Sequence, residues 1–144
     1  MKESIFTYLF LSIIIMNTYA QKADDIIGEY HLPNNIDVEI FKQSDNYFGK
    51  IIKLNDFNDG QTKDIYNPEE SKRNELLIGK IIITNLEFDE QKKQWLNGNM
   101  YGAEKGMEFN LKITEFCDDE IVVVGSKLIF WKTLIWKKTA KKHK

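Results

Sequence analysis

The chain has 144 residues, a length typical of one domain. Its 20 basic and 22 acidic residues give a formal net charge of −2, which argues against a nucleic-acid-binding protein, because such proteins are usually strongly basic. Hydrophobic residues make up 42% of the chain and aromatic residues 12%, so an intrinsically disordered protein is excluded. One cysteine and two histidines are too few for the common zinc sites.

The N terminus has the pattern of an export signal. The apolar run at 5–16 is shorter than the roughly 20 residues that span a bilayer, but it suits the core of a signal peptide. The small residues Thr18 and Ala20 fit a cleavage site. We therefore expect residues 1–20 to be a signal peptide and the mature protein, starting at Gln21, to be periplasmic or secreted, with no membrane span after cleavage. The alternative is that the run forms an N-terminal strand of the domain.

The rest of the chain has the composition of a β protein. Residues 21–144 contain fifteen isoleucines and three alanines, which favours strands over helices. Apolar and polar residues alternate at 107–114 and 36–42, the period of a strand with one buried and one exposed face. We predict about eight strands, at 26–31, 36–42, 47–54, 77–84, 94–101, 107–114, 120–128 and 129–137.

One segment predicts a short helix. Asn67 suits the N-cap, Pro68 the first helical position and Glu70 the third position after the cap, so the helix would run from there toward Glu75. No repeat or flexible linker divides the chain. We therefore expect one mainly β domain over residues 21–138, followed by a basic tail at 139–144.

Two architectures accommodate about eight antiparallel strands in a chain of this length: a sandwich and a closed up-and-down barrel. Periodicity does not distinguish them. A barrel can hold one small ligand in its interior, whereas a sandwich fills its centre with side chains. Aromatic residues are spread along nearly every predicted strand, which favours the barrel slightly.

Few residues could support catalysis. His31 is the only histidine outside the basic tail, and we interpret it as a partly exposed residue at a strand end. Cys117 has no partner for an intramolecular disulfide, so it is either a buried small hydrophobic residue or a reactive or intermolecular thiol. The chain has no G-x-S-x-G motif and no G-x-x-x-x-G-K-[ST] phosphate loop. These observations argue against an enzyme, and we expect no catalytic residues, no cofactor and no metal site.

An ordered series of motifs resembles a known bacterial family. D-x-x-N-P at 64–68 is followed by R-x-x-x-L-x-G at 73–79 and W-x-x-G-x-x-Y at 95–101. With shorter fragments around them, these motifs resemble the exported family filed as domain of unknown function 2147. The resemblance implies a lipocalin-like β-barrel outside the cytoplasm and supplies no established activity. We interpret the matching glycines as backbone requirements such as turns, bulges and close strand crossings; they are Gly28, Gly49, Gly79, Gly98, Gly106 and Gly125.

The matching polar and aromatic residues form the candidate ligand site. Asp64, Asn67 and Arg73 either form an internal network beside the predicted helix, or place Arg73 at the barrel mouth to bind a ligand carboxylate or phosphate. The aromatic side chains either line or fill the barrel. The complete set is Tyr30, Asp64, Asn67, Arg73, Trp95, Tyr101, Phe109 and Trp136.

Two functions from different classes remain. The first is a non-catalytic binding module for a small apolar or amphipathic ligand, such as a fatty acid or a lipid-like molecule. The second is a structural or interaction protein of the cell envelope with a solidly packed barrel, whose edge, loops or basic tail contacts another component. An enzyme ranks third, and the sequence does not indicate the oligomeric state.

Overall fold

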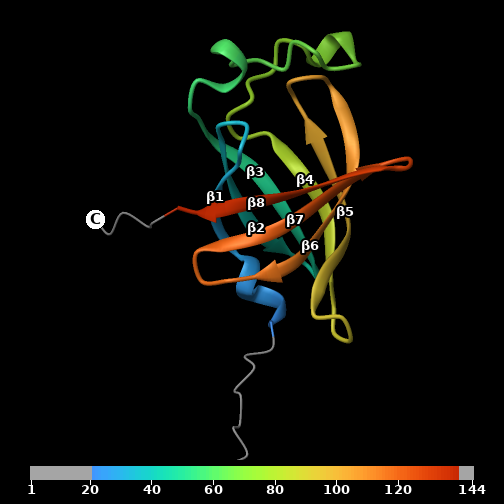
Figure 1. Cartoon of the computed structure of the whole chain (residues 1–144). Helices are drawn as coiled ribbons and strands as arrows, with labels where there is room; N and C mark the ends of the chain where they lie inside the picture. The colour runs from blue at the N-terminus through green and yellow to red at the C-terminus, as the bar shows by residue number, and fades with distance from the viewer. Residues whose placement is uncertain (1–20, 140–144) are drawn as a thin grey trace, which may run out of the picture.

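The computed structural model describes residues 21–139, which form a closed antiparallel barrel of eight strands (Figure 1). Each strand pairs with the next along the chain, and the last pairs with the first, so the predicted up-and-down barrel is confirmed. The predicted signal peptide, 1–20, and residues 140–144 of the predicted tail lie outside the described residues. The strands are β1 (Gly28–His31), β2 (Ile36–Gln43), β3 (Asn46–Leu54), β4 (Ile81–Asp89), β5 (Gln94–Gly102), β6 (Met107–Phe116), β7 (Glu120–Lys127) and β8 (Phe130–Lys138).

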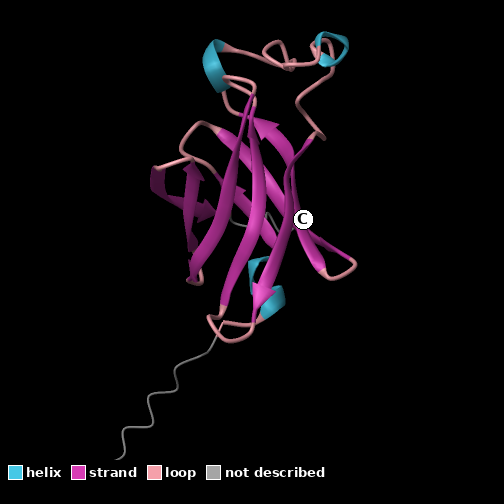
Figure 2. Cartoon of the chain, turned by 90° about the vertical axis from the view of Figure 1, so that its right-hand side faces the viewer, coloured by secondary structure: helices cyan, strands magenta, loops and turns pink. Residues whose placement is uncertain are grey.

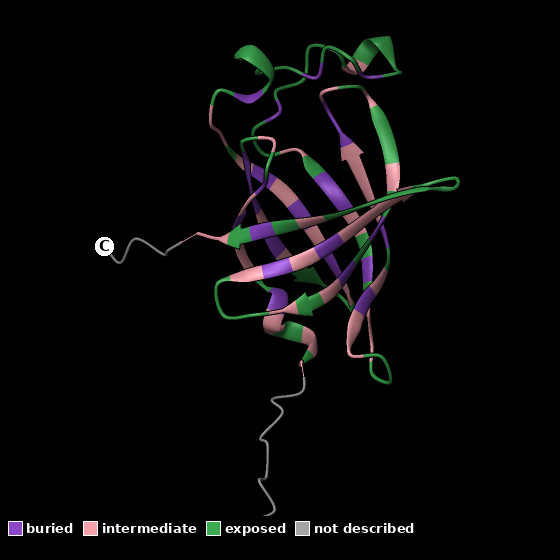
Figure 3. Ribbon diagram, in the orientation of Figure 1, coloured by how far each residue is buried: buried purple, intermediate pink, exposed green. Residues whose placement is uncertain are grey.

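The core lies inside the barrel and receives side chains from all eight strands. Successive side chains of a strand point to opposite faces, so alternate positions are buried. In β7, for example, Ile121 and Val123 are buried, whereas Glu120 and Val122 are only half-buried. Figure 3 shows this alternation of buried and more exposed positions along the strands.

The contact that closes the barrel is narrow. β1 and β8 share two residue pairs, Tyr30 with Lys138 and His31 with Lys137, whereas β7 and β8 share eight. Within the described chain, the segment 130–136 of β8 therefore has a strand partner only on its β7 side. The free end of the β7–β8 hairpin extends away from the barrel body (Figure 1).

A short 3-10 turn, η1 (Ala23–Ile26), lies at one end of the barrel. Aromatic side chains from three strands hold it there, because the phenol of Tyr30, the phenol of Tyr47 and the indole of Trp95 each donate a hydrogen bond to this turn. The acceptors are the carbonyl of Ile26 at 2.9 Å, Oδ1 of Asp24 at 2.5 Å and the carbonyl of Ala23 at 2.8 Å, respectively. Figure 2 shows this turn at one end of the barrel and two further turns at the other.

Those two further turns belong to the long β3–β4 connection: η2 (Phe57–Asp59) and η3 (Glu70–Lys72). The helix predicted from Asn67 toward Glu75 is therefore wrong in extent, since η3 is a single 3-10 turn. Oδ1 of Asn67 accepts a hydrogen bond from the amide of Glu69 at 2.9 Å, an Asx turn that competes with a helical N-cap. The carbonyl of Glu75 accepts from the amide of Asp64 at 3.0 Å, which draws the chain out of helical geometry.

The fourth strand begins later than predicted. β4 starts at Ile81 rather than at residue 77, because Gly79 has a φ of 85°, in the left-handed region that interrupts a strand. The strand then continues past the predicted end at residue 84, to Asp89.

Cys117 lies in the turn between β6 and β7 and is exposed. The interpretation of this residue as a buried small hydrophobic side chain is therefore wrong. A position just beyond the end of a strand has no facing layer of core residues to cover it.

Candidate functional site

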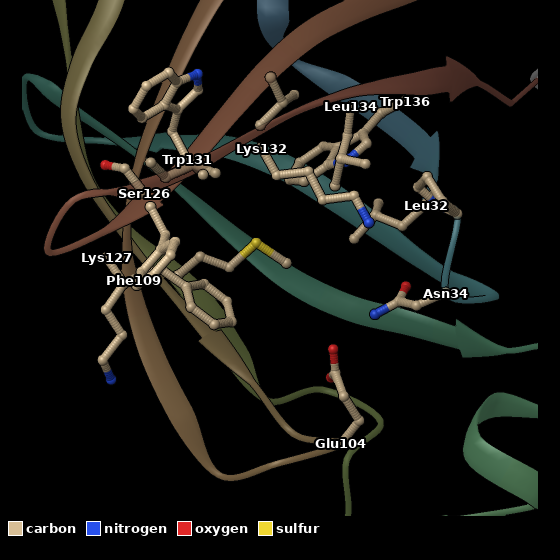
Figure 4. A pocket seen from close by; sticks show the side chains of 16 residues that line it. Leu32, Asn34, Glu104, Phe109, Ser126, Lys127, Trp131, Lys132, Leu134 and Trp136 are labelled. Carbon is tan, nitrogen blue, oxygen red and sulfur yellow. The ribbon is translucent and has the colours of Figure 1, made fainter.

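A partly open cavity of about 480 Å³ is bordered by the β1–β2 loop, the β5–β6 turn and strands β6, β7 and β8 (Figure 4). This volume falls within the range of roughly 300–1,000 Å³ found for small-molecule sites. Much of its wall is apolar, and this part includes Leu32, Met100, Phe109, Leu111, Val123 and Leu134.

Strand geometry explains which side chains reach the cavity. Because alternate residues share a face, Phe130, Lys132, Leu134 and Trp136 of β8 all line it. Trp131, on the other face at the end of the hairpin, also lines it. On β7 the wall includes Gly125, where an added Cβ would have no other atom within 4 Å. Part of the open space therefore exists because this strand position has no side chain.

Three side-chain polar atoms of the described chain are buried without a hydrogen-bond partner, and all three belong to residues of this cavity. They are Nε1 of Trp136, Oε2 of Glu104 and Oδ1 of Asn34. Figure 4 shows Glu104 and Asn34 extending from the loops toward the space bordered by Phe109 and Lys132. Buried polar atoms in folded proteins are almost always hydrogen-bonded. The three residues therefore carry one donor and two acceptors without a partner at the edge of the cavity.

Charges of both signs also border the cavity. Lys132 contributes an ammonium group and Glu104 a carboxylate. Within the described chain neither belongs to an ion pair. An apolar wall with a few polar groups is the usual composition of a site that orients an amphipathic molecule.

The predicted aromatic residues occupy two different places. Phe109 and Trp136 line the cavity. Tyr30 and Trp95 are fully buried at the opposite end of the barrel, where their polar atoms bind the η1 turn. Burial and the nearby charge of Asp25 raise the pKa of the Tyr30 phenol, which remains a hydrogen-bond donor.

Asp64 is the centre of a network in the β3–β4 connection. Its Oδ1 accepts a hydrogen bond from the Tyr101 phenol at 2.6 Å, and its Oδ2 accepts from Nδ2 of Asn67 at 2.7 Å. Nζ of Lys80 lies 3.1 Å from the same Oδ2. Burial acts to raise the pKa of Asp64, but these hydrogen bonds and the Lys80 charge outweigh it, so the pKa lies below its usual value. The pKa of Tyr101 is raised by burial and by the carboxylate that it contacts.

Arg73 is exposed, and its Nε donates to the carbonyl of Asn67 at 2.9 Å. Lys80, rather than Arg73, supplies the positive charge beside Asp64. The structure thus brings Asp64, Asn67, Arg73 and Tyr101 together in one network, and none of the four lines the cavity. Their role in ligand binding stays a prediction.

Sequence reasoning missed Asn34, Glu104, Gly125 and Lys132. The alternation of β8 could have placed Lys132 on the same face as Trp136, since the two positions are four apart and alternate positions share a face. Asn34 and Glu104 lie in loops, where no periodic pattern marks orientation. The sequence interpretation of Gly125 is a backbone requirement, but a Cβ added there would have no other atom within 4 Å.

Two further searches concern residues 21–139 alone. No group of three or more His, Cys, Asp or Glu side chains is placed to hold a metal ion within this range. None of the helices in this part of the chain combines the length and the apolar character needed to cross a bilayer.

Comparisons with known proteins agree with this architecture. The family model described as "Uncharacterized protein conserved in bacteria (DUF2147)" matches residues 28–138. The solved structure of protein HP1028 from Helicobacter pylori, described as belonging to the lipocalin family, superposes with a TM-score of 0.71 at 18% identity. The match covers 85% of this chain and 86% of that chain.

The structural match at this identity establishes the fold, whereas the family model establishes the family. No curated protein matches the chain. The matched residues extend from the start of β1 to the end of β8 and so include every strand of the barrel and the cavity between them. The chain therefore belongs to the DUF2147 family of bacterial proteins and has a lipocalin-like eight-stranded barrel.

Proposed function

We propose that the protein is a non-catalytic binding module for a small amphipathic, lipid-like molecule such as a fatty acid derivative. One observation carries the proposal: the three unpartnered buried polar atoms of the described chain belong to residues that line one largely apolar cavity. The fold supports it, because eight-stranded barrels of this kind have room for one small ligand.

The ligand's apolar body would pack against Phe109, Leu111 and Leu134. Its polar head would accept a hydrogen bond from Nε1 of Trp136 and donate one to Glu104 or Asn34. A hydroxyl or a primary amide offers both a donor and an acceptor. A carboxylate could pair with Lys132, but it has no proton to donate to Glu104.

The alternative function, an envelope interaction protein, requires a solidly packed barrel. A cavity of about 480 Å³ does not fit that requirement. The cavity therefore favours the binding module over the alternative.

We also propose that the chain is exported and acts in the periplasm or outside the cell. The support is the apolar run at 5–16 followed by the small residues Thr18 and Ala20. Amino-terminal sequencing of the protein recovered from the cell envelope or medium should start at Gln21. A sequence that starts at Met1 would contradict export through a cleaved signal.

Native mass spectrometry of gently purified protein, followed by solvent extraction, tests the binding function. We expect a co-purifying lipid-like molecule at a stoichiometry of one. The extracted protein should then bind a long-chain alcohol or primary amide more tightly than the carboxylic acid of the same length. A protein that purifies without ligand, and whose melting temperature none of the three compounds raises, would show that it is not a lipid-binding module.

A further inference from the structure

The tip of the β7–β8 hairpin is strongly apolar and exposed. It consists of Leu128, Ile129, Phe130 and Trp131, whose exposed fractions are 91%, 78%, 73% and 75%. We call these four residues the hairpin tip. It projects from the barrel, and Figure 3 shows it as exposed. Monomeric proteins rarely present a contiguous apolar patch of this kind unless it contacts a partner or a membrane.

The turn itself does not require these residue types. Lys127 pairs with Phe130, so Leu128 and Ile129 form a two-residue turn. Leu128 has a φ of 56°, in the left-handed region where glycine or asparagine is preferred and leucine is strained. Because only the first of the two turn positions has a positive φ, glycine at position 128 would relieve the strain, and a polar residue at position 129 would make the turn more soluble. An apolar, strained turn is therefore evidence for a contact outside the barrel.

The charge around the tip is positive. Lys127 and Lys132 lie on either side of it. The apolar tip thus has a lysine on each side, and an anionic surface complements these two charges.

We propose that the hairpin tip inserts into the surface of an anionic lipid bilayer. Aromatic residues such as Trp131 are favoured at the interface between lipid and water, and flanking lysines can reach anionic headgroups while their aliphatic stems contact lipid. The apolar side chains of the tip enter the boundary between headgroups and acyl chains.

A lipid surface fits the tip better than a protein partner does. A stable protein interface takes about 800 Å² and roughly 20–30 residues from each partner. The tip is convex and offers four consecutive residues. Two copies joined through their tips would also bring the four lysines flanking them close together, which costs free energy. A fluid bilayer adapts to a narrow convex insertion.

Docking of the tip would place the cavity beside the bilayer, because Lys127, Phe130, Trp131 and Lys132 also border the cavity. Vesicle binding by the tip does not depend on a ligand inside the barrel. The inference therefore stands or fails separately from the proposed ligand-binding function.

Co-sedimentation of the mature protein with vesicles tests this inference. The protein should bind vesicles that contain phosphatidylglycerol, bind phosphatidylcholine vesicles more weakly, and lose affinity as salt is raised. A double variant, Phe130→Ser with Trp131→Ser, should bind at least about tenfold more weakly. A double variant, Lys127→Gln with Lys132→Gln, should lose the preference for anionic vesicles.

The matched control replaces two exposed apolar residues elsewhere, Leu76→Ser with Ile78→Ser, whose exposed fractions are 63% and 51%. It should bind vesicles like the wild type. The single variant Ile129→Ser tests the tip again if the double variant unfolds. The proposal is overturned if the wild type does not bind either vesicle, or if the folded tip variants bind as well as the wild type. A dimer that dissociates in the tip variants, without vesicle binding, would assign the tip to a second copy and also overturn it.

Discussion

Trp95 and Trp136 are both buried in the barrel, but their indole groups differ in one respect. Nε1 of Trp95 donates a hydrogen bond to the carbonyl of Ala23 at 2.8 Å, whereas Nε1 of Trp136 is buried without a partner. The first bond ties the η1 turn to β5, and the second donor belongs to a residue that lines the cavity. Substitutions at these two residues can therefore distinguish an effect on folding from an effect on ligand binding.

Replacing each indole by a smaller ring should therefore have different effects. Both Trp95→Phe and Trp136→Phe lose similar side-chain volume, but only Trp95→Phe breaks a hydrogen bond and leaves a carbonyl unpaired. We expect Trp95→Phe to lower the free energy of unfolding by about 1–3 kcal/mol more than Trp136→Phe does. Denaturant unfolding measures this difference. Equal losses of stability would show that the Ala23 bond contributes nothing.

The Asp64 network predicts a specific pH dependence. The pKa of Asp64 is lower in the folded protein than the roughly 3.9 of an unfolded chain, so its ionised form stabilises the fold. This contribution is complete above about pH 5 and is lost as the pH falls through the folded-state pKa. We expect the wild type to lose more free energy of unfolding between about pH 6 and 3 than Asp64→Asn does. If both proteins have the same pH profile, the ionised carboxylate does not stabilise the connection.

The hydrogen bond between Tyr101 and Asp64 can be tested at constant pH. Tyr101→Phe keeps the ring but removes the donor to Oδ1 of a fully buried carboxylate. We expect a loss of about 1–3 kcal/mol in the free energy of unfolding at neutral pH. In the Asp64→Asn background the same change should cost less, since a neutral amide oxygen is a weaker acceptor. Additive losses in the double variant would mean that the two side chains are not coupled.

Two glycines should respond oppositely to alanine. Gly106 has a φ of 63°, and a Cβ there would lie 1.9 Å from the carbonyl oxygen of Tyr66. We expect Gly106→Ala to lower the free energy of unfolding by about 1–3 kcal/mol or more. Gly125→Ala meets open space and should raise it by about 0.4–1 kcal/mol. Thermal and denaturant unfolding of both variants measures these changes in stability. A Gly106→Ala variant that is more stable than Gly125→Ala would contradict the prediction.

The strands of the barrel could be predicted from the sequence because apolar and polar residues alternate along them. Alternating residues such as those of 107–114 identify a strand and its buried face without knowledge of its neighbours. The helix predicted from Asn67 is wrong in extent, because the same residue type serves an N-cap and an Asx turn, and the side chain of Asn67 also binds Asp64. A local motif does not contain that tertiary contact.

The cavity could not be predicted in the same way. It depends on the short pairing between β1 and β8, on the loops that carry Asn34 and Glu104, and on the missing side chain at Gly125. The pairing and the loops are relations between segments far apart in the sequence, and the effect of Gly125 depends on where β7 lies in the barrel. Trp136 and Phe109 were proposed as candidate residues, but sequence alone did not decide between lining and filling the barrel.

The central claim is that the cavity binds an amphipathic molecule, and filling the cavity tests it most directly. No other atom lies within 4 Å of a Cβ added at position 125, so we expect Gly125→Phe to place its ring in the cavity, whereas Gly125→Ala is the matched control that leaves most of the space free. Both variants should fold, with melting temperatures at or above that of the wild type.

Isothermal titration of the delipidated proteins with a long-chain primary amide gives the decisive comparison. We expect wild type and Gly125→Ala to bind one molecule each, and Gly125→Phe to bind about 100-fold more weakly or not at all, because its ring occupies the space that the ligand needs. A wild-type protein that does not bind the amide, the alcohol or the acid, or a folded Gly125→Phe that binds as tightly as the wild type, would contradict the account.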